Sequence, residues 1–78
     1  MFADYDAMKK MVEAAVAEFP REFGLRAWPG ERFKVLPHES YVHDTTGEVM
    51  LYTGIWRDGR WQGFAKGTAA EFRREMVK

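Results

Sequence analysis

The residues whose types and spacing best suit binding chemistry are the tryptophans and arginines of the stretch Trp56-Arg57-Asp58-Gly59-Arg60-Trp61. Asp-Gly between alternating apolar residues predicts a hairpin with a two-residue type I′ turn, because both central residues of that turn take positive φ. Counting outward from the turn gives the expected cross-strand pairs: Trp56 with Trp61, Gly54 with Gly63, and Tyr52 with Ala65. Trp, Tyr and Arg are the residue types that dominate interface hot spots. The hairpin therefore predicts a partner-binding surface.

A second turn, Asp44-Thr45-Thr46-Gly47, extends the hairpin into a three-stranded meander. Closing it as a four-residue loop places Tyr41 opposite Met50 and Val42 opposite Val49. Because side chains alternate with period two, this register sorts the sheet into two faces. One face is aliphatic, and its expected members are Val42, Val49, Leu51, Thr53, Ile55 and Phe64. The other is mainly aromatic, and its expected members are Tyr41, His43, Met50, Tyr52, Trp56 and Trp61.

We expect the aliphatic face to form the core and the aromatic face to bind a partner. The candidate partner-binding residues are Tyr41, Met50, Tyr52, Trp56, Arg57, Arg60 and Trp61. The opposite arrangement stays open, since facing glycines at 54 and 63 would let a helix approach closely and make the aromatic side chains core. Under either arrangement the two helices are too small to cover both faces of the sheet. We therefore expect the uncovered face to bind another protein, or a second copy of this chain in a homodimer.

The histidines predict no metal site, because His38 and His43 are five residues apart. On a strand such residues point to opposite faces, whereas zinc proteases use two histidines four apart on a helix. Ser40, His43 and Asp44 do not suit a catalytic triad, since neighbours on a strand diverge and a nucleophile must hydrogen-bond to its base. His43 is better interpreted as a cross-strand polar partner of Glu48. We therefore expect no catalytic residues, no metal, no cofactor and no enzyme activity.

Two helices are expected to flank the meander. Apolar residues from Tyr5 to Phe19 recur at helical spacing, with Asp4 as the N-cap and Pro20 as the stop. A second helix is expected to begin at Thr68-Ala69-Ala70-Glu71, which has the pattern of a capping box.

The segment between the first helix and the meander is harder to interpret. Residues 20–31 fit a short helix, an irregular strand or a packed loop, with a type II turn at Pro29-Gly30 and Trp28 partly buried. Arg32–Leu36 alternates and predicts an edge strand that Pro37 ends. The expected fold is α+β: an N-terminal helix, a three- (possibly four-) stranded antiparallel meander and a C-terminal helix, in a two-layer sandwich. It forms a single domain over residues 1–78.

Composition favours a folded, cytoplasmic domain. Of the 78 residues, 46% are apolar and 15% aromatic, which argues against a disordered chain, and cysteine is absent. Without cysteine there is no disulfide scaffold, thiolate zinc site or cysteine nucleophile. We expect no signal peptide and no membrane association, because no apolar run approaches the ~20 residues of a span. The net charge is zero, yet residues 1–56 carry six cations against nine anions and residues 57–78 carry six against three.

These features favour a small non-enzymatic protein-binding module that inhibits or modulates its partner by occlusion. A chain of this size without a catalytic set is typical of phage and mobile-element accessory proteins, of which anti-CRISPR inhibitors are one example. The alternative is a nucleic-acid-binding protein. A three-stranded sheet followed by a helix is similar to the DNA-binding module of phage-type integrases, and the element order resembles that of double-stranded-RNA-binding domains. Double-stranded-RNA-binding domains carry a lysine cluster at the start of their last helix, whereas this chain has Gly67-Thr68-Ala69-Ala70 at that place. A self-associating structural subunit is a third possibility.

Overall fold

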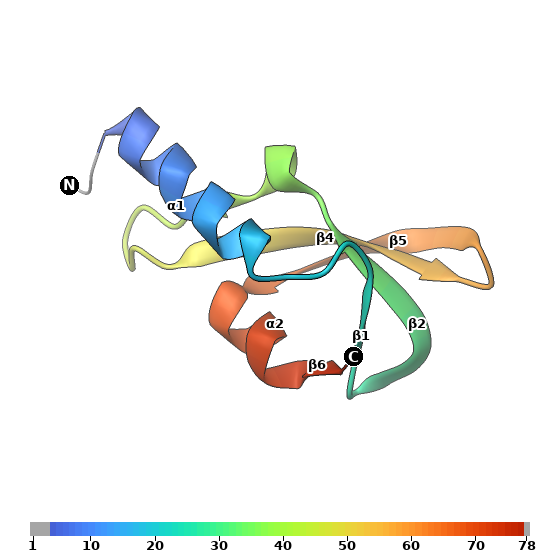
Figure 1. Cartoon of the computed structure of the whole chain (residues 1–78). Coiled ribbons are helices and arrows are strands. Elements are labelled where there is room, and N and C mark those ends of the chain that lie inside the picture. Colours follow the sequence, from blue (N-terminus) through green and yellow to red (C-terminus); the bar gives the residue numbers. More distant parts are fainter. Residues whose placement is uncertain (1–3, 78) are drawn as a thin grey trace.

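The computed structural model describes residues 4–77, which form two α-helices, a 3-10 helix and six strands (Figure 1). The helices are α1 (Tyr5–Ala17), η1 (Pro37–Glu39, 3-10) and α2 (Ala69–Glu75). The strands are β1 (Phe23–Leu25), β2 (Trp28–Val35), β3 (Tyr41–Val42), β4 (Val49–Arg57), β5 (Arg60–Thr68) and β6 (Met76–Val77). The predicted α+β fold, with an N-terminal helix, an antiparallel sheet and a C-terminal helix, is confirmed. The predicted strand count of three or four is too low.

Strand β4 is the centre of the sheet. It pairs with β5 along one edge, so β2 and β3 share its other edge, with β3 beside the first residues of β4. β1 pairs with β2 and β6 pairs with β1, and all of these pairings are antiparallel. The strand predicted over Arg32–Leu36 is therefore part of β2, but its predicted place at a sheet edge is wrong, because β2 lies between β1 and β4.

The uncertain segment before β2 is a hairpin. β1 leads through a turn at Arg26-Ala27 into β2, so Pro29-Gly30 lies inside a strand and the type II turn predicted there is wrong. Gly30 takes a φ of +85° in that strand. Trp28 is 51% exposed, with its ring edge-on to Phe33, and is thus less buried than expected.

The β4–β5 hairpin has the predicted turn but not the whole predicted register. Asp58 and Gly59 both have positive φ, and Trp56 faces Trp61 as expected. Beyond this pair β5 contains one extra residue, Gln62, and Gly63 takes a φ of +153°. Such a bulge shifts every later pair by one residue. The observed pairs are Ile55 with Gly63, Gly54 with Phe64, Thr53 with Ala65 and Tyr52 with Lys66, so the predicted pairs Gly54–Gly63 and Tyr52–Ala65 are wrong.

The core lies between the sheet and α2, and the last turn of α1 and the residues after it close one end. Its buried members are Phe19, Phe23, Leu25, Phe33, Leu51, Ile55, Ala69 and Phe72. Both helices begin where predicted: the Asp4 carboxylate accepts a hydrogen bond from the Ala7 N–H at 2.9 Å, and both bonds of the Thr68–Glu71 capping box are present. In Figure 1 the tip of the β4–β5 hairpin extends away from both helices. One long surface of the hairpin is thus left outside the core.

Candidate functional site

The bulge in β5 determines which residues share the outer surface of the hairpin. Phe64 and Lys66 lie opposite Gly54 and Tyr52. Residues directly opposite each other project to the same side of a sheet, so Phe64 and Lys66 accompany Tyr52. Phe64 is 56% exposed. The prediction that Phe64 belongs to the aliphatic core is therefore wrong.

The outer surface of the sheet combines aromatic and basic side chains, and we call it the aromatic face. Its apolar members are Tyr41, Met50, Tyr52, Trp56, Trp61 and Phe64, and its cations are Arg32, Lys34 and Lys66. The other side of β4 carries Leu51, Thr53 and Ile55, all of them buried. The aliphatic face is thus the core, as expected, and the alternative with an aromatic core is excluded.

Three rings form a continuous row across the hairpin. The Phe64 centroid lies 5.2 Å from that of Trp61, with the rings edge-on, and 5.5 Å from that of Tyr52, with the rings tilted. Edge-on and offset geometries are favourable for aromatic pairs, so contacts between neighbouring rings stabilise the arrangement of the row. Trp61 is 54% exposed, nearly as much as Phe64. The row therefore offers a large apolar surface that the described part of the chain leaves open.

Trp56 lies closer to the sheet than its cross-strand partner Trp61. The Lys34 Nζ atom is 4.6 Å from the centroid of the Trp56 ring, which is within cation–π distance. Lys34 reaches this ring from β2, where it faces Gly54 on β4. The two side chains extend the face from the hairpin onto the neighbouring strand.

The charged side chains of the aromatic face are cations. Arg32 Nε donates to Glu22 Oε1 at 3.5 Å, and both side chains are nearly half exposed, so this pair is screened by solvent. Lys34 and Lys66 have no carboxylate within ion-pair distance among residues 4–77. The face is therefore complementary to an acidic partner.

The two arginines of the hairpin have different surroundings. Arg57 forms an ion pair with Glu31, whose side chain is only 6% exposed. This pair ties the end of β4 to β2, so Arg57 has a structural role. Arg60, opposite Arg57, is exposed near the hairpin tip, and its carbonyl accepts a hydrogen bond from the Gln62 side chain. Partner contact by either arginine stays a prediction.

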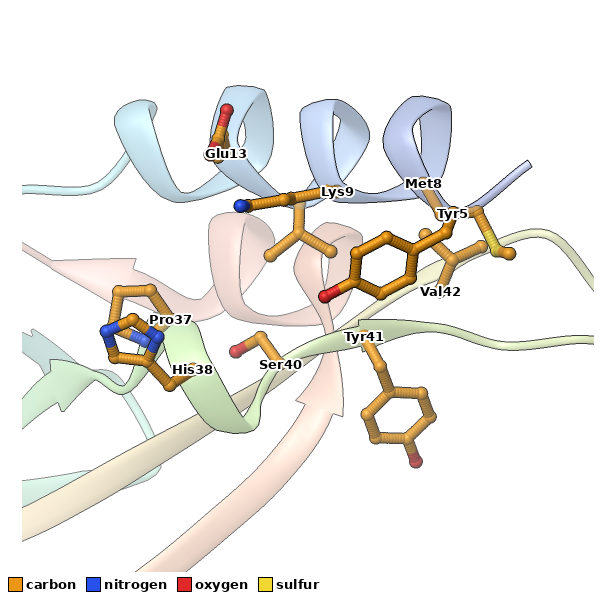
Figure 2. A pocket seen from close by; sticks show the side chains of 10 residues that line it. Tyr5, Met8, Lys9, Glu13, Pro37, His38, Ser40, Tyr41 and Val42 are labelled. Atoms are coloured by element: carbon orange, nitrogen blue, oxygen red, sulfur yellow. The ribbon is translucent and has the colours of Figure 1, made fainter. Parts of the chain in front are cut away.

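Tyr41 and Met50 lie at the end of the face that is far from the hairpin tip. They face each other across β3 and β4, as predicted, and Tyr41 is 41% exposed. Figure 2 shows Tyr41 pointing away from α1, whereas Tyr5 and Val42 extend into the space between α1 and β3. Tyr41 therefore presents its ring on the aromatic face.

A groove of about 380 Å³ lies between α1 and the η1–β3 segment (Figure 2). The Ser40 hydroxyl at its wall donates to the Leu36 carbonyl at 3.0 Å and accepts from the Tyr52 N–H at 3.0 Å, so it links β4 to η1. His43 Nδ1 accepts from the Thr45 N–H at 3.2 Å and shapes the next turn. Within residues 4–77, no three His, Asp or Glu side chains are grouped to hold a metal ion. The described residues that line the groove thus form no metal site of this kind.

Sequence reasoning missed four members of the face. Phe64 and Lys66 were displaced by the bulge, for which Gly63 inside a strand pattern is the available signal. Arg32 and Lys34 reach the face because β2 pairs with β4. Local sequence carries no comparable signal for that long-range pairing.

No protein-family model matches the chain, and no curated protein or solved structure matches it either. Neither helix within residues 4–77 is long and apolar enough to cross a membrane. The geometry and chemistry of the aromatic face are therefore the basis for assigning a function.

Proposed function

We propose that this protein is a non-enzymatic binding protein that captures another protein through the aromatic face and modulates it by occlusion. One observation carries the proposal: the rings of Trp61, Phe64 and Tyr52 form a row in which two rings are more than half exposed. Single exposed apolar side chains are ordinary on protein surfaces. A contiguous row with cations beside it is typical of an interaction surface.

The paired strands that carry the aromatic face, and the contacts between its rings, favour tight binding. The aromatic side chains project from paired strands, and the row is held by contacts among its own rings. Binding by such a surface costs little conformational entropy, because the side chains are ordered before the partner arrives. Coverage of the face by a partner would block whatever site the partner uses there, which is the accessory-protein role predicted from the chain's size.

Single-stranded nucleic acid is the second candidate partner. The observation that favours it is the position of Arg32, Lys34 and Lys66 beside exposed aromatic rings, since bases stack on aromatic side chains while cations contact the phosphates. The whole chain has no net positive charge, which is unlike a dedicated nucleic-acid binder. Protein is therefore the first choice.

The proposal is tested by affinity capture from a lysate of the cells in which the protein is naturally made, with and without nuclease. The baits are the wild type, the double variant Trp61→Ala/Phe64→Ala, and Tyr5→Ala as a matched control. Tyr5 is an aromatic residue of α1 that is 75% exposed and lies away from the face. We expect a nuclease-resistant protein to be captured by the wild type and by Tyr5→Ala, and to be lost from the double variant. The captured protein should then bind the double variant more weakly by about 2 kcal/mol or more, roughly 30-fold.

Circular dichroism of the three baits shows whether the double variant retains its fold. Equal capture by the wild type and by a folded double variant contradicts the proposal. Capture that disappears with nuclease assigns the face to nucleic acid, and affinity should then fall steeply with salt. A mass that rises with protein concentration, measured by sedimentation, assigns the face to self-association.

A further inference from the structure

The outer edge of β5 has no strand partner within the described residues. Among residues 4–77, β5 pairs with β4 and with no other strand. A free edge presents backbone N–H and C=O groups with which another extended chain can pair. This edge also borders the aromatic face, because Phe64 and Lys66 are residues of β5.

The backbone groups of Lys66 and Phe64 point toward this free edge. The Tyr52 carbonyl accepts from the Leu36 N–H at 2.7 Å, and the Tyr52 N–H donates to Ser40 Oγ at 3.0 Å. Both partners lie on the side of β4 that is opposite β5, so Tyr52 and Lys66 form a non-hydrogen-bonded pair. The N–H and C=O of Lys66 therefore point outward, and the period of two gives Phe64 the same orientation.

The regular part of the edge is short. The bulge at Gln62 and Gly63 interrupts it on one side. On the other side the Thr68 N–H donates to Glu71 Oε1 at 2.8 Å and is not free to pair. What remains matches a partner strand of about five residues, which is an ordinary strand length.

We propose that the protein partner adds an extended acidic segment to the edge of β5, where it pairs with the N–H and C=O groups of Phe64 and Lys66. The inference rests on the proposed function and specifies how the partner is held. Alternate side chains of the added strand lie beside Phe64 and Lys66 on the aromatic face. An apolar side chain beside Phe64 and a carboxylate beside Lys66 complete the interaction.

The charge and the backbone groups of β5 favour an acidic protein strand over a second copy of this chain and over nucleic acid. β5 carries Arg60 and Lys66 and no acidic residue. A second copy of this edge would bring the Lys66 side chains of both copies close together with no carboxylate on either strand, which is unfavourable. Nucleic acid has no N–H and C=O groups at strand spacing and leaves the outward groups of Phe64 and Lys66 unpaired. An acidic protein strand satisfies both the hydrogen bonds and the charge.

The test uses a display library of random 12-residue peptides selected on the full-length immobilised protein. We expect the selected peptides to carry an apolar residue and an acidic residue two positions apart, and each bound peptide to slow amide exchange at Phe64 and Lys66 by about tenfold or more, measured by ¹⁵N NMR. Lys66→Pro removes an N–H that β4 does not use and is expected to weaken binding about tenfold or more. Lys66→Gln keeps that N–H but removes the charge. It is expected to weaken binding less than Lys66→Pro does, by about as much as high salt weakens binding of the wild type.

Several outcomes overturn the inference. They are a selection without binders, a basic consensus, or bound peptides that leave exchange at Phe64 and Lys66 unchanged. Tighter binding by a (dT)12 oligonucleotide than by any selected peptide, or concentration-dependent protection of the same amides without peptide, also overturns it. If the edge amides stay unprotected while Trp61→Ala/Phe64→Ala still abolishes partner capture, the strand-addition mode fails and the proposed function stands.

Discussion

The indole ring of Trp56 lies over Gly54. A Cβ atom built on Gly54 would come within 2.5 Å of Cζ3 and 2.7 Å of Cη2 of that ring. The absence of a side chain at position 54 thus lets the indole lie against the sheet, within reach of Lys34 Nζ. This explains why Trp56 is partly buried although it faces the exposed Trp61.

Gly54→Ala is expected to lower the free energy of unfolding by about 1–3 kcal/mol, because the added methyl group and the ring cannot occupy the same space. The backbone of Gly54 is not in the positive-φ region, so no conformational strain contributes. Urea denaturation measures the change. A red shift of tryptophan emission should report that the Trp56 ring has moved into solvent.

The same substitution in a Trp56→Ala background provides the control. With the ring removed, Gly54→Ala is expected to be neutral or to stabilise by about 0.5 kcal/mol, since alanine restricts the unfolded chain. The two substitutions are therefore coupled, as neighbouring residues usually are. Equal destabilisation in both backgrounds would contradict the packing of Trp56 on Gly54.

A pair of truncations tests which side of the sheet is core. Leu51 is fully buried and Phe64 is 56% exposed. Leu51→Ala is expected to cost about 2–5 kcal/mol of unfolding free energy through the cavity that it leaves. Phe64→Ala is expected to cost less than about 1 kcal/mol, although it removes the larger side chain. Thermal or urea unfolding of the two variants measures both losses of unfolding free energy. A larger loss for Phe64→Ala than for Leu51→Ala would show that the hairpin register is wrong.

The elements that were predictable from sequence have local causes. The Asp58-Gly59 turn requires positive φ at both residues, and it has them. The Thr68–Glu71 capping box is equally local, since its bonds span three residues. Both features could be inferred because the side chains that determine them are close in the chain.

The features that were missed depend on long-range pairing or on a single glycine. β1 and β6 are three and two residues long, and they pair across about fifty residues of sequence. No local pattern of hydrophobicity marks strands this short. The bulge before Phe64 moved one aromatic residue and one lysine to the candidate site, and only Gly63 indicated it in advance. The predicted aromatic face thus included both hairpin tryptophans but lacked its cations, and partner contact by its residues stays a prediction.

Arg57→Ala is expected to lower the free energy of unfolding by about 1–2 kcal/mol at pH 7. The substitution removes the ion-pair partner of Glu31, a carboxylate that is largely shielded from water, while the half-exposed guanidinium keeps the loss moderate. Arg60→Ala on the facing strand is the matched control, and its effect should stay within about 0.5 kcal/mol. Chemical denaturation of both variants and of Glu31→Gln/Arg57→Ala measures this. The double variant should recover part of the loss, and the same loss for both arginine variants would show that the ion pair is unimportant.

Acidification is expected to weaken the start of α2 through Glu71. Hydrogen bonds from the Thr68 backbone N–H and then from the Thr68 hydroxyl hold the pKa of the Glu71 carboxyl below its usual value of 4.5. Because the pKa is lower in the folded chain than in the unfolded chain, this stabilisation is complete above pH 4.5 and is lost as the pH falls through the folded-state value. Glutamine in Glu71→Gln can still accept from the Thr68 N–H but does not titrate. The difference in Tm between wild type and Glu71→Gln should therefore shrink between pH 7 and pH 3, and a difference independent of pH would show that the charged carboxylate does not stabilise the cap.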